Sequence, residues 1–209
     1  MYVPVFNALD DAGEIRALLA ATGAAELITV RPDGYPTSTL LPVMWDGDRL
    51  IFHLAKANPH WRLIRPGTPA LAVVTGPQAY VSPTWYPSKQ EHGRVVPTWN
   101  YSAVLFTGLA TVHLDPDWLR EAVTRLTDQN EGRRADPWHV TDAPEPYLET
   151  QLRAIVGIEL VIERVEGKAK LSQNRSAADH AGVIAGLRRE GAGSEAALAA
   201  AMERTGVRH

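Results

Sequence analysis

Cysteine is absent from the 209-residue sequence, and this absence excludes several kinds of chemistry at once. Without thiols the chain forms no disulfides, no thiolate zinc sites and no iron–sulfur clusters, and it has no cysteine nucleophile. A chain that does without disulfides is typical of a reducing compartment. We therefore expect a cytoplasmic location.

Long apolar runs are also missing. No stretch approaches the roughly 18 residues that a membrane-spanning helix needs. The first residues, MYVPVFNALDD, lack the basic region and the apolar region of a secretory signal. We expect no membrane association.

An excess of positive charge is a third absence. Lysine and arginine total 21 against 24 aspartates and glutamates, a net charge of −3. Proteins that bind DNA through its phosphates usually show a global or local basic excess. The basic residues of the C-terminal helical region are few, namely Arg188, Arg189, Arg204 and Arg208. The composition thus disfavours direct DNA binding, and only a local patch would support it.

Common catalytic and metal-binding motifs are absent too. The sequence has no G-x-S-x-G elbow, no H-E-x-x-H and no P-loop, and its seven histidines do not show ligand spacing. We expect no metal site. His53 and His60 are seven residues apart, but the Asn58-Pro59 break between them argues against a shared helical face.

The N-terminal half has the pattern of a β-meander preceded by a helix. Residues 12–23 carry apolar residues at helical spacing and end at Gly23. Three apolar runs follow, at 26–31, 36–45 and 49–55, separated by Pro-Asp-Gly and Asp-Gly-Asp turn signals. A short helix from Asn58 through Leu63 and a strand over 69–76 come next.

The C-terminal half alternates strands and helices. We predict strands over 96–114 and 155–167 and helices over 116–129 and 146–154, and two terminal helices within about 176–205. No repeat or linker interrupts the chain. The predicted fold is α+β, one domain over residues 1–209 with a mainly antiparallel sheet and peripheral helices.

The stretch FHLAKANPHW, residues 52–61, is a first candidate binding element. Lys56 ends a strand, and the helix that Asn58 begins would direct free N–H groups toward the same corner. A lysine beside a helix start is a reasonable phosphate site, with hydroxyls of Thr37, Ser38 and Thr39 near it. The alternative is a solvated lysine at a strand end and an asparagine that only caps.

Two further stretches combine groups that could contact a ligand. Five of the twelve Trp and Tyr residues fall within 22 positions, a density that suits a flat ligand or a loop packed by its own aromatics: Tyr80, Trp85, Tyr86, Trp99 and Tyr101. The run EGKAKLSQNRS, residues 166–176, follows an apolar strand and is almost wholly polar. It is either a ligand-contacting loop or a solvated loop in which Asn174 or Ser176 caps the next helix.

These motifs, taken in order, closely resemble the PaiB family of FMN-binding negative transcriptional regulators. The resemblance runs through MYVP, FHLAKANPHW, QAYVSPTWYPSKQEHGRVVPTWNYSAV and DAPEPYLETQLRAIVGIELVIERVEGKAKLSQNRSAADHAGV. It implies an antiparallel split β-barrel, related to pyridoxamine phosphate oxidases, that forms a homodimer and holds FMN at the subunit interface.

The resemblance also implies which residues bind the cofactor. One side of the flavin would be lined by Ser38, Thr39, Leu40, Leu41, His53, Leu54, Ala55, Lys56, Asn58 and Trp61, with Lys56 and Asn58 nearest the phosphate. The other side would be closed by Trp99, Asn100, Tyr101, Lys170, Ser172 and Gln173, some of them from the partner subunit. A small-molecule ligand would lie near Tyr80, Trp85 and Tyr86.

Three positions depart from the family pattern. Leu40 and Leu105 stand where relatives commonly carry histidine, and Ala169 stands where they often carry tryptophan. If these positions face the cleft, it is wider and more apolar than in relatives. The alternative is drift at packing positions.

Three functions follow from the resemblance. The first is a flavin-binding transcriptional regulator, and the second is an FMN-dependent oxidoreductase acting on a small molecule among the aromatic residues. The third is a haem-binding split barrel in which His53 or His113 serves as axial ligand.

Overall fold

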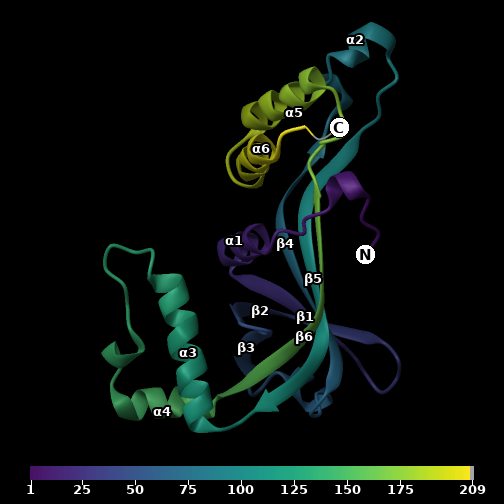
Figure 1. The fold of residues 1–209 in the computed structure, drawn as a ribbon. Helices are drawn as coiled ribbons and strands as arrows, with labels where there is room; N and C mark the ends of the chain where they lie inside the picture. The colour runs from purple at the N-terminus through teal and green to yellow at the C-terminus, as the bar shows by residue number, and fades with distance from the viewer. Residues whose placement is uncertain (208–209) are drawn as a thin grey trace. The chain divides into compact units, whose positions relative to one another are not determined.

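The computed structural model describes residues 1–207, so Arg208 of the predicted basic patch lies outside the described residues. Six strands and six α-helices carry the fold (Figure 1). The strands are β1 (Ala24–Val30), β2 (Pro36–Asp46), β3 (Arg49–Ala55), β4 (Thr68–Val81), β5 (Thr98–His113) and β6 (Ile155–Lys170). The α-helices are α1 (Ala12–Thr22), α2 (Ser88–His92), α3 (Pro116–Glu131), α4 (Glu145–Arg153), α5 (Ala177–Glu190) and α6 (Ser194–Thr205). Four short 3₁₀ turns complete the order: η1 (Val5–Asn7), η2 (Pro59–Leu63), η3 (Pro83–Trp85) and η4 (Val140–Asp142).

The strands form a closed barrel in the order β1-β2-β3-β6-β5-β4. The β1–β2 and β2–β3 pairs are hairpins, and both are antiparallel, as are β3–β6 and the closing pair β1–β4. The turns of the hairpins place Gly34 and Gly47 at positive φ, as their turn signals predict. The predicted α+β fold with an antiparallel barrel is confirmed.

Backbone contacts divide the chain into two compact units. Unit 1 comprises residues 1–15, 75–104 and 166–207 of the described chain, and unit 2 comprises residues 16–74 and 105–165. Strands β4, β5 and β6 contribute residues to both units. The prediction of one domain over 1–209 stays a prediction.

Unit 2 contains the apolar barrel interior and helices α3 and α4. Side chains such as Leu27, Phe52 and Ile158 are fully buried because alternate residues of each strand point inward. Strands β5 and β6 approach so closely that a Cβ on Gly108 would lie 1.9 Å from the Val161 carbonyl oxygen. Glycine at position 108 is therefore required by packing.

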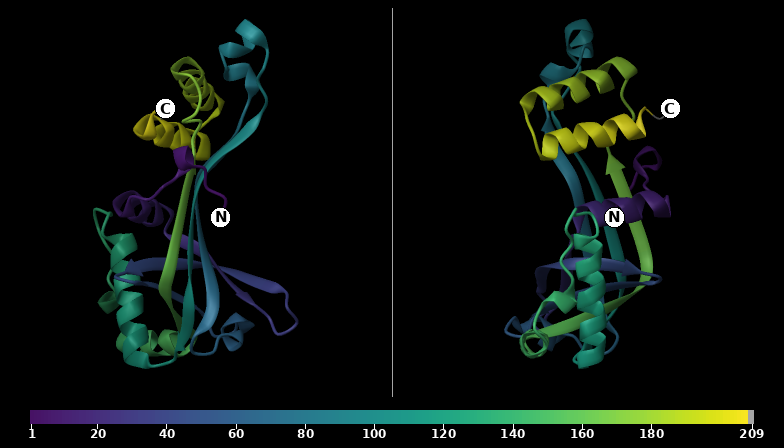
Figure 2. Two further views of the ribbon diagram at one scale, coloured as in Figure 1. Left: turned by 45° about the vertical axis from the view of Figure 1, so that its right-hand side comes forward. Right: turned by 90° about the vertical axis from the view of Figure 1, so that its left-hand side faces the viewer.

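Unit 1 contains the antiparallel helix pair α5 and α6, which lie side by side (Figure 2). Their shared core is formed by Val183, Leu187, Leu198 and Met202, all fully buried. Ser176 caps α5 by accepting a hydrogen bond from the Asp179 amide, as one of the two interpretations of the polar run expects.

Three element predictions need correction. The helix from Asn58 to Leu63 is a single 3₁₀ turn. Strand β4 runs on to Val81, and β6 runs on to Lys170, so Lys168 and Lys170 belong to a strand and not to a loop. The apolar pattern ended before these lysines, and for that reason sequence analysis ended the strand too early.

Candidate functional site

The predicted cofactor residues fall into two groups, each within one unit. The first group lies in unit 2, on β2, on β3 and around η2, and comprises Ser38, Thr39, Leu40, Leu41, His53, Leu54, Ala55, Lys56, Asn58 and Trp61. The second lies in unit 1, on β5, at the end of β6 and in the following turn, and comprises Trp99, Asn100, Tyr101, Lys170, Ser172 and Gln173.

Lys56 lines a cavity of about 450 Å³ in unit 2, which we call the Lys56 cavity. Its walls are formed by Lys56, Leu114, Pro116, Asp117, Leu119, Arg120, Glu149, Leu152, Arg153 and Ile155. Two of its cations are neutralised, since Arg120 pairs with Glu145 and Arg153 pairs with Glu149 at 3.7 Å. The Lys56 ammonium forms no ion pair with any carboxylate of residues 1–207. Lys56 is thus the cation of this cavity that is left for an anionic ligand.

Thr39 and Asn58 belong to a separate hydrogen-bond network around the buried His60. The His60 ring is held at Nδ1 by the Thr39 hydroxyl at 2.8 Å and at Nε2 by the Thr29 hydroxyl at 2.9 Å. Asn58 donates from Nδ2 to the Thr39 oxygen at 3.4 Å. Burial lowers the pKa of His60, so the ring favours its neutral form. These polar groups fix η2 against β2.

The helix-terminus argument for a phosphate site is not supported by this geometry. The Asn58 side chain accepts the hydrogen bond of the His60 amide at 3.0 Å, so the first free N–H is already occupied. The turn has five residues and carries almost no macrodipole. The Thr39 hydroxyl is likewise engaged by His60 and Asn58. Of these groups, only the Lys56 ammonium remains available to a phosphate.

The other residues of the first group differ in exposure. Leu41 and Leu54 point into the barrel core, whereas Ser38 and Ala55 are exposed. Trp61 donates from its indole nitrogen to the Lys56 carbonyl at 3.0 Å. Among the departures from the family pattern, Leu40 is 65% exposed, Leu105 is half-buried and Ala169 is buried.

The two histidines considered as axial haem ligands are both in unit 2. Burial lowers the pKa of His53, and its Nδ1 has no hydrogen-bond partner within residues 1–207. The His113 ring stacks on Trp118 with centroids 4.2 Å apart and planes 6° apart, and its Nε2 is buried. The His113 ring is therefore engaged by Trp118, and His53 is the better candidate for an axial haem ligand.

The second group surrounds a smaller pocket in unit 1, which we call the basic pocket. Its volume is about 280 Å³, and its walls are Tyr2, Pro4, Phe6, Asn7, Thr98, Asn100, Lys168, Lys170, Ser172, Asn174 and Arg175. Asn100 is completely buried and donates from Nδ2 to the Ser172 hydroxyl at 2.9 Å. Gln173 is also buried, and it bonds the Leu171 amide and the Ala169 carbonyl. Gln173 thus shapes the turn that carries the pocket.

Three cations line the basic pocket without a carboxylate partner in residues 1–207. Lys168 donates to the Tyr2 carbonyl at 3.0 Å, and Lys170 donates to the Trp99 carbonyl at 2.7 Å and to the Thr98 hydroxyl. Arg175 lies over the Tyr86 ring, 5.1 Å from its centroid. Burial lowers the pKa of Lys170, and the charges of Lys168 and Arg175 lower it further. The pocket therefore holds a concentrated positive charge.

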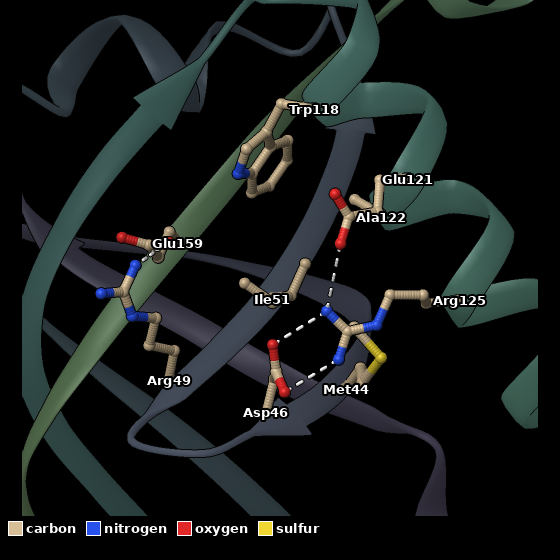
Figure 3. Close-up of a pocket in the computed structure, with 9 residues that line it drawn as sticks. All are labelled: Met44, Asp46, Arg49, Ile51, Trp118, Glu121, Ala122, Arg125 and Glu159. Carbon is tan, nitrogen blue, oxygen red and sulfur yellow. Dashed lines mark hydrogen bonds and ion pairs between the residues drawn. The ribbon is translucent and has the colours of Figure 1, made fainter.

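A second pocket of unit 2 shows the opposite arrangement of charge. This ion-pair pocket, of about 230 Å³, is lined by Met44, Asp46, Arg49, Ile51, Trp118, Glu121, Ala122, Arg125 and Glu159 (Figure 3). Arg125 forms two 2.8 Å contacts with Asp46 and lies 3.7 Å from Glu121, and Arg49 bonds Glu159 at 2.8 Å. Each of its cations meets a carboxylate. These ion pairs connect α3 to β2 and β3 to β6, and they leave little charge for a ligand.

The aromatic loop is partly used for packing. Trp85 lies against α5, where a Cβ on Gly186 would be 2.2 Å from its ring. Tyr86 is almost fully buried, whereas Tyr80 is 49% and Trp99 48% exposed. The Trp99 indole donates to Gln78 at 3.0 Å. Tyr80 and Trp99 are thus the exposed rings of this cluster, whereas Trp85 and Tyr101 are half-buried.

Sequence analysis missed His60, Tyr2 and the pairing of Lys168 with Lys170. The spacing of His60 was considered only for a metal site and set aside, and its bonds to Thr29 and Thr39 join residues 31 and 21 positions apart, which only the fold reveals. Lys168 and Lys170 are two residues apart on β6 and therefore lie on the same face of the strand. This follows from the sequence only if the strand is extended to residue 170. No group of three or more histidine, aspartate or glutamate side chains suited to a metal lies within residues 1–207. Within the same range no helix combines the length and apolar character needed to cross a membrane.

Comparisons with known proteins agree on the kind of protein. A family model described as "Putative FMN-binding domain" matches residues 1–164. The chain is 32% identical to Protease synthase and sporulation protein PAI 2 of Bacillus subtilis (strain 168) over 194 residues, which cover 91% of this chain and 90% of that protein.

Solved structures show the same fold at lower identity. The FAD and haem binding protein of Mycobacterium smegmatis matches with a TM-score of 0.59 and 22% identity, covering 78% of this chain and 73% of that one. The flavocytochrome Anf3 of Azotobacter vinelandii matches with a TM-score of 0.57 and 18% identity, covering 80% and 72%. These likenesses support the barrel fold found here.

Proposed function

The chain belongs to this FMN-binding domain family and is an FMN-binding protein of the PaiB type, and we propose that Lys56 binds the FMN phosphate in a homodimeric negative transcriptional regulator. The observation that carries the proposal is the unneutralised ammonium of Lys56 in a cavity of about 450 Å³. This volume is within the usual range of small-molecule sites.

The chemistry of the Lys56 cavity fits the cofactor. A lysine that meets no carboxylate supplies a point charge for a phosphate, and Leu119, Leu152 and Ile155 supply apolar surface for a flat ring system. FMN, when bound, supplies one-electron and hydride transfer chemistry. The residues of the cavity contribute binding and orientation. The Trp61 bond to the Lys56 carbonyl holds the backbone from which the lysine side chain extends.

A pair of lysine variants tests the role of Lys56. We expect Lys56→Gln to weaken FMN binding at least tenfold in a fluorescence titration, because the phosphate loses its counter-charge. Riboflavin, which lacks the phosphate, should bind the variant and the unaltered protein equally. Lys89→Gln is the matched control, since Lys89 is exposed on α2 and lines none of the three pockets. Equal FMN affinity in Lys56→Gln would place the phosphate elsewhere.

The regulatory part of the proposal rests on the relationship to PAI 2, whose name refers to protease synthesis and sporulation. Direct DNA binding has little support from charge, because Arg188 bonds Glu203 on α6 at 2.8 Å and the net charge is −3. We therefore propose regulation through a protein or small-molecule partner. A gel-shift series with the protein's own promoter region, run from about 50 to 200 mM salt, should show no salt-sensitive band. A band that weakens steeply with salt would contradict this.

The homodimer and the cytoplasmic location are part of the same proposal. The absence of cysteine supports a reducing compartment, and light scattering after size exclusion gives the mass of the particle. A mass near twice 22.9 kDa is expected. A monomer at working concentration would contradict a dimeric protein.

A flavin-dependent oxidoreductase is the second candidate, favoured by the half-exposed rings of Tyr80 and Trp99, on which a small substrate could stack. Bound flavin that is reduced by a nicotinamide cofactor and reoxidised by a small acceptor would favour this candidate. The absorption spectrum of the purified protein separates flavin from haem, the third candidate. A Soret band would favour haem and direct attention to His53.

A further inference from the structure

The segment around η2 in unit 2 carries positive charge that the chain does not neutralise. Residues 49–90 contain no aspartate or glutamate, although the chain has 24 of these residues. Arg62, in η2, and Arg65, in the turn after it, are both exposed. Neither pairs with a carboxylate of residues 1–207, whereas other arginines of unit 2, such as Arg125, do. The local sequence therefore leaves two arginine charges open to solvent.

The two arginine side chains are held by neutral groups. The Arg65 guanidinium donates from Nη1 to the Arg62 carbonyl at 3.0 Å, so it lies against residue 62. The Arg62 guanidinium lies over the Trp61 ring, 5.2 Å from its centroid. A planar guanidinium that stacks on an aromatic ring still presents N–H groups that match both oxygens of a carboxylate. Two such groups in one short segment favour an anionic partner that spans both.

The backbone that carries these arginines is fixed to the barrel. The buried His60 ring bonds two threonine hydroxyls, and Ile64 is only 3% exposed. The Arg65 amide donates to the Thr68 hydroxyl at 2.8 Å, and the Gly67 amide donates to the Ala110 carbonyl on β5 at 3.1 Å. A partner would therefore meet a backbone that is already ordered, which lowers the entropy cost of binding.

We propose that Arg62 and Arg65, which we call the η2 patch, form a docking surface for an acidic segment of a partner protein. Carboxylates of that segment accept hydrogen bonds from the two guanidinium groups, a pairing that is stronger than one between neutral groups. The proposal rests on the regulation through a partner proposed above and names the chemistry of that partner. The η2 patch lines none of the three pockets, so it is separate from the FMN site at Lys56.

An acidic protein segment fits the η2 patch better than a nucleic acid does. Nucleic acids gain affinity from many phosphate contacts, and the patch offers two cations in a chain of net charge −3. Unit 2 as a whole contains more carboxylates than cations, and this excess repels a long polyanion. A short acidic segment meets only the acid-free surface around η2.

Fluorescence anisotropy with labelled probes tests the class of partner on protein saturated with FMN. A peptide of eight glutamates should bind at about 50 mM salt and lose about fivefold or more of its affinity at about 200 mM, because salt screens exposed charges. A glutamine-serine peptide of the same length should not bind. The proposal is wrong if the glutamate peptide does not bind, or if a single-stranded oligonucleotide binds the same two arginines more tightly.

Arginine variants assign the binding to the η2 patch. The double variant Arg62→Gln with Arg65→Gln should weaken the glutamate peptide by about tenfold or more, and Arg62→Lys by about twofold, since lysine keeps the charge but not the paired N–H groups. Arg133→Gln is the matched control, because Arg133 is an exposed arginine of the loop after α3. Circular dichroism confirms that each variant is folded. A folded double variant with unchanged affinity would overturn the assignment.

Two further measurements separate the η2 patch from the proposed function. The double arginine variant should bind FMN with unchanged affinity, and a loss of FMN binding would assign these arginines to the cofactor and exclude the docking surface. Failure of the proposed regulation through a partner has a different signature. It would appear as a salt-sensitive promoter band that persists in the double arginine variant, while the glutamate peptide still binds the unaltered protein.

Discussion

The ion-pair pocket of unit 2 and the basic pocket of unit 1 are both lined by charged side chains, but they use charge in opposite ways. In the first, Arg49 and Arg125 each meet a carboxylate at 2.8 Å. In the second, Lys168, Lys170 and Arg175 meet none within residues 1–207. Neutralised charge fastens elements of the fold, whereas unneutralised charge is available to a ligand.

The difference also shows how the sequence encodes each pocket. In the ion-pair pocket the partners come from strands and from α3, so the pairing is long-range. In the basic pocket two of the cations alternate along one strand, and the third follows in the next turn. Mutation should accordingly change stability at the first pocket and ligand affinity at the second.

The largest expected effect tests the structural role of the ion-pair pocket. Trp118 packs on both apolar clusters of α3 and stacks on His113, so Trp118→Ala should lower the free energy of unfolding by about 3 kcal/mol. Urea denaturation measures the change. Trp138→Ala is the control, because Trp138 is 47% exposed, and a similar loss there would contradict the packing account.

A smaller effect is expected from the ion pair itself. Arg125→Met leaves Asp46 without its main partner, and since both side chains are about 40% exposed, the loss should be about 1 kcal/mol or less. The difference between variant and unaltered protein should shrink at high salt. Arg133→Met, in the exposed loop after α3, should change nothing. A loss that is insensitive to salt would point to packing of the arginine stem and not to charge.

The smallest effects are those of pH, and they should have different ranges in the two pockets. Hydrogen bonds from Arg125 lower the pKa of Asp46, so its contribution to stability is complete above about pH 3.8 and is lost as pH falls below that value. Burial lowers the pKa of Lys170, so the unfolded chain holds its proton to higher pH than the folded chain. Stability should therefore rise as pH increases toward 10.5.

Denaturation midpoints across pH measure both slopes. The acid slope should disappear in Asp46→Asn, and the alkaline slope should disappear in Lys170→Met. An alkaline slope that survives in Lys170→Met would show that the lysine is not under electrostatic stress in the folded protein.

Much of the fold is predictable from local signals. Hairpin turns at Pro-Asp-Gly and Asp-Gly-Asp and the amphipathic spacing of α3 gave the correct elements, because these are properties of neighbouring residues. The site was harder to predict. Sequence placed Lys56, Asn58 and Thr39 at one phosphate corner, but Asn58 and Thr39 are engaged by His60, which only the folded chain reveals.

Sequence alone likewise could not predict which cations are neutralised by a carboxylate. Nothing near Arg125 indicates that Asp46, 79 positions away, is its partner. Nor does the run EGKAKLSQNRS show that its glutamate pairs with the chain's own amino terminus while its lysines and arginine meet only neutral groups. Long-range pairing decides which cations remain for a ligand.

The central claim is that the unneutralised ammonium of Lys56 binds the phosphate of FMN. Phosphorus NMR of the protein with FMN tests it most directly. The claim predicts a bound FMN resonance that Lys89→Gln keeps and Lys56→Gln loses. A bound FMN resonance that is unchanged in Lys56→Gln would contradict it.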